Sequence, residues 1–240
     1  MKFNTKWEIC HKEDFFQYLN KKQVPKDPIK FHLKYIQDVF ALGELINYLD
    51  NQKRTKKIKI GEIGANHSRV LPELRQYTKN LFAIDVYDRE IGGGYAYKPQ
   101  NIEYKIIETL VGDSKDTIED EYFDVLFSIS VVENVESQML KKFILDSLRI
   151  LKKDGVIIHL IDFYCNNDED LQSGIVRDLI KNLEEIDNSF ECPIDDWSFK
   201  TSYCSNDDYT MWEWNSMAPH LEEVRNTHQS CSFILKIIKE

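Results

Sequence analysis

Apolar side chains recur every three or four residues over 31–49, and over 57–63 they fall at every second residue. The first spacing puts the apolar residues on one side of an α-helix, and the second is the alternation of a β-strand. A second helix is predicted over 69–78, with Pro72 in its first turn, where backbone amides have no intrahelical acceptor to lose. The pattern therefore predicts a helix followed by a strand, a turn and another helix.

Further along the chain, apolar segments typical of strands alternate with helical patterns. A helix is predicted over 137–151, its end marked by the basic pair and glycine of 152–155, and a second over 169–186. The strand candidates are 81–86, 102–107, 123–130, 156–161 and 230–238. Because strands and helices alternate, we predict an α/β fold with a mainly parallel sheet.

The N-terminal residues lack this alternation of strands and helices. Residues 1–30 are polar with aromatic interruptions, so we predict an N-terminal extension with a helix over 12–21, followed by a linker that contains Pro25 and Pro28. A length of 240 residues suits one elaborated domain, which we place at 31–240.

Charge and composition narrow the classes of partner. With 31 basic and 41 acidic side chains the net charge is −10, which repels phosphate backbones and anionic lipids, so neither nucleic acid nor membrane is expected as a partner. The apolar runs are too short to cross a bilayer and residues 1–20 lack the apolar core of a signal peptide, so we expect a cytoplasmic protein. The five cysteines are scattered without a CxxC pair, and no metal is expected.

Small residues follow the predicted strand over 57–63. Gly64 and Ala65 let the backbone approach a ligand closely, and Asn66 tolerates a positive φ angle, although an ordinary tight turn explains the same residues. The next strand ends in Asp85, at the position where an acid accepts hydrogen bonds from both ribose hydroxyls of a bound nucleoside. An acid after a strand is often only a solvated loop residue, but its position after this turn favours the ligand role.

With these motifs the chain resembles the class I S-adenosylmethionine-dependent methyltransferases. Four of its segments resemble motifs of that family, in the family's order: Glu62-Ile63-Gly64; Asp85; 123–135, with Asn134 where many members have histidine; and 151–157, with Asp154 in place of a proline. The glycine-rich loop departs from the family pattern at Asn66 and Ser68.

The resemblance implies a Rossmann-like, doubly wound α/β fold whose mainly parallel, seven-stranded sheet has an antiparallel C-terminal strand. It also implies that residues 31–240 form the methyltransferase domain, with a substrate-covering insertion within 163–230. The cofactor that it implies is S-adenosylmethionine. An adenine-contacting acid is implied after the third strand, for which Asp113 is preferred to Glu108. The cofactor-binding residues expected are Glu62, Gly64, Ala65, Asn66, Asp85, Asp113 and Ser130.

Two other functions fit the same fold. An NAD-dependent oxidoreductase is disfavoured, because a dinucleotide's pyrophosphate needs the G-x-G-x-x-G backbone that this loop lacks. A non-catalytic cofactor-binding protein would keep the fold without the reaction.

Candidate catalytic residues interrupt the apolar strand over 156–161. His159 and Asp162 are proposed as a base and its orienting acid, although the alternation of a strand puts them on opposite faces unless the strand ends between them. Glu133 is a further candidate for contact with cofactor or substrate. The acids and aromatics of 190–219 suit a sugar or a small amine, or equally a protein contact. We therefore expect methylation of an oxygen or nitrogen atom of a small polar metabolite, with a sugar as one candidate.

Overall fold

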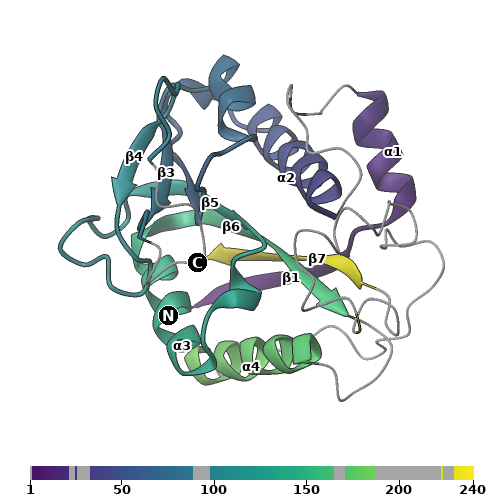
Figure 1. Ribbon diagram of the computed structural model, residues 1–240. Coiled ribbons are helices and arrows are strands. Elements are labelled where there is room, and N and C mark those ends of the chain that lie inside the picture. Colours follow the sequence, from purple (N-terminus) through teal and green to yellow (C-terminus); the bar gives the residue numbers. More distant parts are fainter. Residues whose placement is uncertain are drawn as a thin grey trace.

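The computed structural model describes residues 2–21, 25, 33–88, 98–164, 171–187, 223 and 230–240. A seven-stranded sheet runs through the molecule, with helices on both of its faces (Figure 1). Its strand order is β1-β7-β6-β5-β2-β3-β4.

Five neighbouring strands are parallel, and the remaining two continue the sheet beyond them. The parallel strands are β2 (Ile60–Ile63), β3 (Leu81–Asp85), β4 (Lys105–Glu108), β5 (Phe123–Ile129) and β6 (Leu151–Tyr164). The C-terminal strand β7 (Ser230–Lys239) is antiparallel to β6 and to β1 (Phe3–Ile9), which forms the edge. The predicted fold, a mainly parallel seven-stranded sheet with an antiparallel C-terminal strand, is confirmed.

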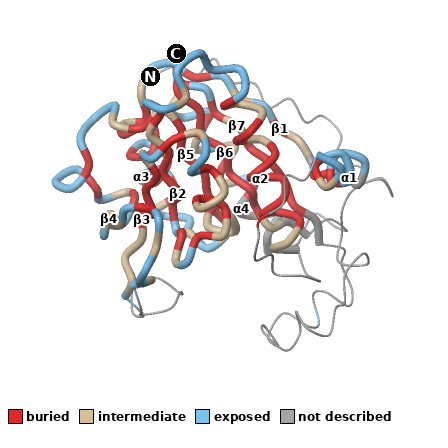
Figure 2. Tube along the Cα trace, turned by 90° about the horizontal axis from the view of Figure 1, so that it is seen from above, coloured by how far each residue is buried: buried red, intermediate tan, exposed pale blue. Residues whose placement is uncertain are grey.

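Apolar residues form one layer on each face of the sheet. Helices α1 (Lys12–Asn20) and α2 (Leu33–Asp50) cover one face, while α3 (Ser137–Ile150) and α4 (Leu171–Ile186) cover the other. The buried positions follow the sheet and the inner sides of these helices (Figure 2). No helix in these described ranges combines the length and the apolar character needed to cross a bilayer.

The first strand is a feature that the sequence pattern did not reveal. The prediction for 1–30 was a helical extension, and helix α1 is present, but residues 3–9 pair along their whole length with β7. The ring of Trp7 lies 5.1 Å from that of Phe233, and both side chains are buried. Pairing with a segment at the opposite end of the chain supplies this burial, so the short, mostly polar segment becomes a strand.

Two predicted helix features are wrong. The helix expected over 69–78 is a 3-10 helix, η2 (Leu71–Gln76); the other short 3-10 helices are η1 (Thr55–Lys57) and η3 (Val132–Asn134). Helix α3 does not stop at Gly155, because the chain passes directly from Ile150 into β6. Gly155 is required for another reason: a Cβ atom there would lie 2.9 Å from the carbonyl oxygen of Asp124.

Part of the predicted insertion over 163–230 is helix α4, and most of the rest, including 190–219, lies outside the described residues.

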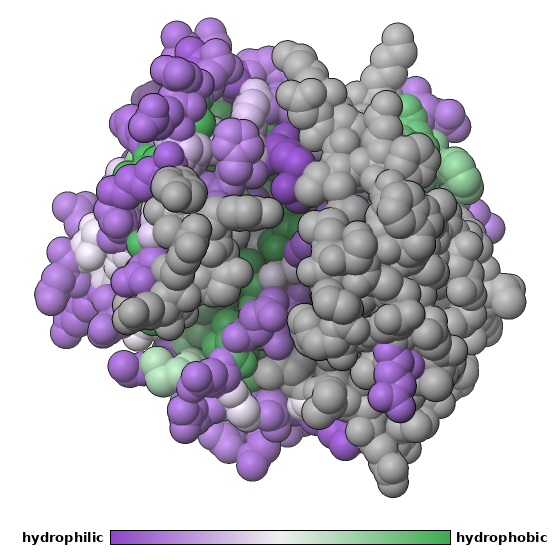
Figure 3. Space-filling view, in the orientation of Figure 1, coloured by the Kyte–Doolittle hydropathy of each residue, from purple (hydrophilic) through white to green (hydrophobic). Residues whose placement is uncertain are grey.

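On the face shown in Figure 1, apolar side chains are exposed in a hollow near the middle, next to polar surface (Figure 3).

Candidate functional site

The loop after β2 is a tight turn held against the neighbouring strands. Gly64 has a φ of +66°, and a Cβ atom there would lie 2.5 Å from a methyl carbon of Val131, so a larger residue does not fit. Its N–H donates to the carbonyl oxygen of Ile84 at 2.8 Å. Ala65 is buried, and Asn66 has a φ of 44°, which confirms the positive φ expected there.

Asp85 joins this loop directly. Its Oδ2 accepts a hydrogen bond of 2.7 Å from the backbone N–H of Asn66, and its Oδ1 accepts one of the same length from Val86. The hydroxyl of Tyr87 donates to the carbonyl oxygen of Asn66 at 3.2 Å. Because each carboxylate oxygen has two acceptor sites, one per oxygen is left for an external donor, which matches the two hydroxyls of a ribose.

Glu62 supports the loop from within the sheet. Its side chain is buried, and Oε2 accepts a hydrogen bond from the hydroxyl of Ser68, which in turn accepts the N–H of Leu71 at 2.9 Å. Burial raises the pKa of Glu62 to about 8, against the effect of the Ser68 hydrogen bond, and the negative charge of Asp38 acts in the same direction as burial. Glu62 is therefore protonated at neutral pH and braces the turn.

A second polar cluster lies at the carboxyl ends of β5 and β6. Ser130, with a φ of 51°, places its Oγ 2.8 Å from Oε1 of Gln37 and 3.1 Å from Oδ1 of Asp162. The Nε2 group of Gln37 donates to the same Asp162 oxygen at 2.6 Å and to Ser232 at 3.1 Å. Sequence reasoning missed Gln37; the available signal was a polar pair, Gln37-Asp38, between apolar residues of a helix.

Glu133 lies beside this cluster, in η3. The residue as a whole is half-buried, but both carboxylate oxygens are shielded from solvent and have no hydrogen-bond partner among the described residues. Burial raises the pKa of Glu133 to about 8; the charge of Asp162 acts in the same direction and that of Lys34 opposes it. Such an unpartnered buried carboxyl group is unusual in a folded protein.

The predicted pair of His159 and Asp162 is not formed. His159 is 2% exposed, shares a 2.7 Å hydrogen bond with Ser128 and has its ring 5.7 Å from that of Phe143 of α3. Burial lowers its pKa to about 3, so the imidazole is neutral. Because β6 continues past Asp162, the alternation of side chains puts the two residues on opposite faces of the sheet.

The two candidates for the adenine-contacting acid have different surroundings. Asp113 is exposed, and its side chain has no partner among the residues described. The loop that contains Asp113 is anchored by Asp146 of α3, which accepts hydrogen bonds from the N–H groups of Gly112 at 2.7 Å and Ser114 at 3.1 Å. Glu108 is the register partner of Asp85 and forms an ion pair with Lys98.

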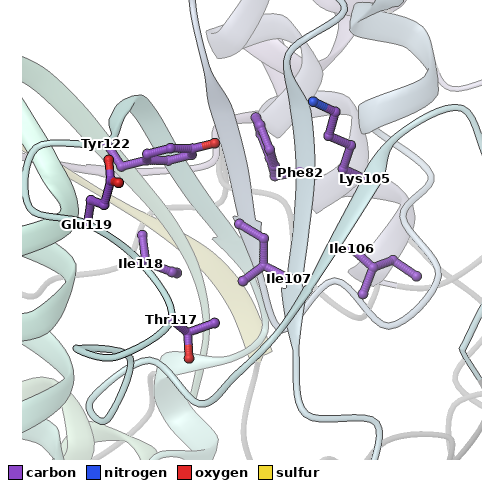
Figure 4. Close-up of a pocket in the computed structure, with 8 residues that line it drawn as sticks. All are labelled: Phe82, Lys105, Ile106, Ile107, Thr117, Ile118, Glu119 and Tyr122. Carbon is purple, nitrogen blue, oxygen red and sulfur yellow. The ribbon is translucent and has the colours of Figure 1, made fainter.

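A cavity of about 340 Å³ lies elsewhere, between β3, β4 and the turn before β5 (Figure 4). Phe82 and Lys105 line it and are register partners, three residues before Asp85 and Glu108 in the same two strands. The cavity is therefore displaced from the carboxyl edge where Asn66 and Asp85 meet.

The strand order, the glycine turn after β2 and the carboxylate that ends β3 define a class I methyltransferase fold. Residues 61–159 match the family model described as a methyltransferase domain. Over residues 61–159 the chain is thus similar to a methyltransferase domain, and S-adenosylmethionine is the cofactor that this match supports.

Solved structures agree with this fold. A putative sarcosine dimethylglycine methyltransferase from Galdieria sulphuraria is 11% identical, with a TM-score of 0.50 and coverage of 86% of each chain. Phosphoethanolamine N-methyltransferase 2 from Haemonchus contortus is 10% identical, with a TM-score of 0.50 over 85% of this chain and 52% of that one. At these identities the likeness shows the fold alone. No curated protein matches the chain.

Proposed function

We propose that the protein transfers a methyl group from S-adenosylmethionine to an oxygen or nitrogen atom of a small polar metabolite. One observation supports it most: the 2.7 Å hydrogen bond from the N–H of Asn66 to Asp85, which joins the turn and the acid at one edge of the sheet. A sugar is one candidate acceptor, because acidic and aromatic residues are frequent in 190–219. These residues lie outside the described part of the chain.

The proposed roles follow from the positions of the residues. Asp85 accepts the ribose hydroxyls, and Asp113 contacts the adenine. The backbone at Gly64, Ala65 and Asn66 passes close to the cofactor, while Glu62 holds this turn in place through Ser68. Ser130 contacts the cofactor in this proposal, and it also fixes Asp162 together with Gln37.

Methyl transfer from a sulfonium is an in-line displacement, and the bound cofactor supplies the electrophilic methyl group. The contribution of the chain is to align the acceptor with that group and to exclude water. Where the acceptor has to lose a proton, we assign this task to the acids that follow β5 and end β6, Glu133 and Asp162, rather than to His159, because His159 is enclosed in the core on the other face.

Isothermal titration with S-adenosylhomocysteine tests the cofactor site. Asp85→Asn should raise the dissociation constant about 10- to 100-fold, since hydrogen bonds to a charged group contribute about 1.5–3 kcal/mol. Asp154→Asn is the matched control: Asp154 is an exposed acid near the start of β6, and asparagine accepts its φ of 61°.

Absence of S-adenosylhomocysteine binding by the folded protein, or binding of NADH in its place, would refute the proposal. Cofactor binding without methylation of any acceptor in a broad panel would favour the non-catalytic alternative.

A further inference from the structure

Two acids stand together at the carboxyl ends of β5 and β6, and one of them has no partner. Asp162 is held by Gln37 and Ser130, whereas both oxygens of Glu133 lack a hydrogen bond among the described residues. The two groups are close enough for the charge of Asp162 to act on Glu133. The free protein thus contains an acceptor group that its own described residues do not satisfy.

This acidic pair is adjacent to the cofactor turn. The side chain of Val131 packs against Gly64; Ser130 directly precedes Val131 in the sequence, and Glu133 follows it by two residues. Parallel strands β2 and β5 are direct neighbours, with Ile63 opposite Ser128 in the register, so their carboxyl ends open into the same crevice. A ligand between Asp85 and Glu133 would lie across this shared edge.

The chemistry of the pair selects a cation. A carboxyl group removed from water without a donor is unfavourable, and a neighbouring acid adds repulsion whenever both are ionised. The positive charge of Lys34 already acts on Glu133. An ammonium group between the two acids adds a further positive charge, and it brings three N–H donors to oxygens of Glu133 that have no hydrogen bond among the described residues. A neutral hydroxyl offers one donor and no charge, so it compensates the pair less well.

We propose that Glu133 and Asp162 bind the amino group of the acceptor, and that the protein is an N-methyltransferase acting on a small primary or secondary amine. This inference rests on the proposed function and specifies its acceptor atom. Asp162, fixed by Gln37 and Ser130, orients the amine, and Glu133 accepts its proton.

The reaction balances with these groups. With a pKa of about 8, Glu133 is protonated in the free protein at pH 7, so binding of the amine as an ammonium ion displaces that proton to solvent and leaves a carboxylate beside the cation. The ammonium ion then transfers one of its protons to Glu133. The freed nitrogen lone pair attacks the methyl carbon, and the carbon–sulfur bond breaks with its electrons remaining on sulfur. The positive charge passes from sulfur to the methylated nitrogen, and Glu133 keeps the proton as the product leaves, which restores the protonated state of the free protein.

The test measures methylation of matched amine and hydroxyl acceptors by release of S-adenosylhomocysteine. The pairs are methylamine and methanol, ethanolamine and ethylene glycol, and glucosamine and glucose. At least one amine should exceed its hydroxyl counterpart about 10-fold or more in kcat/KM, the ratio that one charged hydrogen-bonded contact supports.

Glu133→Gln should lower turnover of that amine about 10-fold or more while S-adenosylhomocysteine affinity changes less than about 3-fold. Asp162→Asn, which keeps the oxygen that accepts from Gln37, provides an independent variant if Glu133→Gln does not fold. Glu136→Gln is the control, because it removes an exposed carboxylate from the same loop and should leave turnover unchanged.

Three results would overturn the inference: no amine is methylated, hydroxyl acceptors match the amines, or Glu133→Gln weakens S-adenosylhomocysteine binding as much as it weakens turnover. The last result would assign the acidic pair to the amino group of the cofactor. Intact S-adenosylhomocysteine binding by the wild-type protein, together with methylation of any acceptor, would leave the proposed function standing.

Discussion

Arg69, on the loop after β2, pairs with Asp38 of α2 through two hydrogen bonds, Nε to Oδ2 at 2.5 Å and Nη2 to Oδ1 at 2.9 Å. The Asp38 side chain is fully buried and that of Arg69 is 25% exposed. The pair connects the helix that carries Gln37 to the turn that meets Asp85, so it holds the two halves of the candidate site in register.

Arg69→Met should lower the free energy of unfolding by about 3 kcal/mol at pH 7, because it leaves the carboxylate of Asp38 buried without its counter-charge. Burial already raises the pKa of Asp38, so the loss should shrink at acidic pH, where the carboxyl is protonated and needs no partner. Urea unfolding at pH 7 and pH 5 measures both effects. Arg75→Met, which removes an exposed pair with Glu103, should change stability by less than about 1 kcal/mol; an equal loss in both variants would contradict the prediction.

Glu62 should make the protein less stable as the pH rises. Its pKa is about 8 in the folded state against an ordinary value of 4.5 for a glutamate, so the unfolded chain releases the proton first. The stabilising contribution of the protonated group is complete below pH 4.5 and is lost progressively as the pH rises to 8. Glu62→Gln keeps an acceptor for the Ser68 hydroxyl but cannot ionise.

Chemical unfolding at pH 5 and pH 8.5 should therefore show a smaller decline for Glu62→Gln than for the wild type. Some decline should remain, because burial also raises the pKa of Glu133. Identical declines in the two proteins would show that Glu62 does not titrate in this range.

Gly64→Ala should weaken S-adenosylhomocysteine binding about 10-fold or more and lower stability by about 1–2 kcal/mol, since an L-residue with positive φ is strained and its Cβ meets Val131. Asn66→Gly is the matched comparison: it retains the N–H that Asp85 accepts and relaxes a φ of 44°. Calorimetric titration of both variants should show near-normal affinity for Asn66→Gly. Equal affinity of Gly64→Ala and the wild type would mean that the turn does not hold the cofactor.

His159→Leu should reduce stability by about 1–3 kcal/mol and leave kcat within about 3-fold of the wild type, because it strands the buried hydroxyl of Ser128 without touching the crevice. Adding Ser128→Ala should recover part of the lost stability, as both members of the hydrogen bond are then gone. Thermal unfolding and methylation assays on the single and double variants check this. A large fall in kcat with normal stability would restore His159 as a catalytic candidate.

The sequence by itself determined the alternation of strands and helices, the turn at Gly64 and the position of Asp85. These features depend on local properties: side-chain periodicity, the backbone freedom of glycine and asparagine, and an acid placed directly after an apolar strand. The positive φ at Asn66 follows from the same local preferences. For that reason the succession of strands β2 to β6 along the chain and the positions of the turn and the acid could be read from the sequence, whereas the order of the strands in the sheet came from the structure.

Tertiary structure decided which polar groups meet across distant segments. Residues 3–9 become a strand only because β7 lies beside them, and Gln37 reaches Asp162 and Ser232 only because α2 packs over the ends of β6 and β7. The separation of His159 from Asp162 depends on how far β6 extends. The lack of a hydrogen-bond partner for Glu133 among the described residues depends on which segments pack around it. Burial and partner choice are set by contacts between residues far apart in the chain, and local patterns contain no information on those contacts.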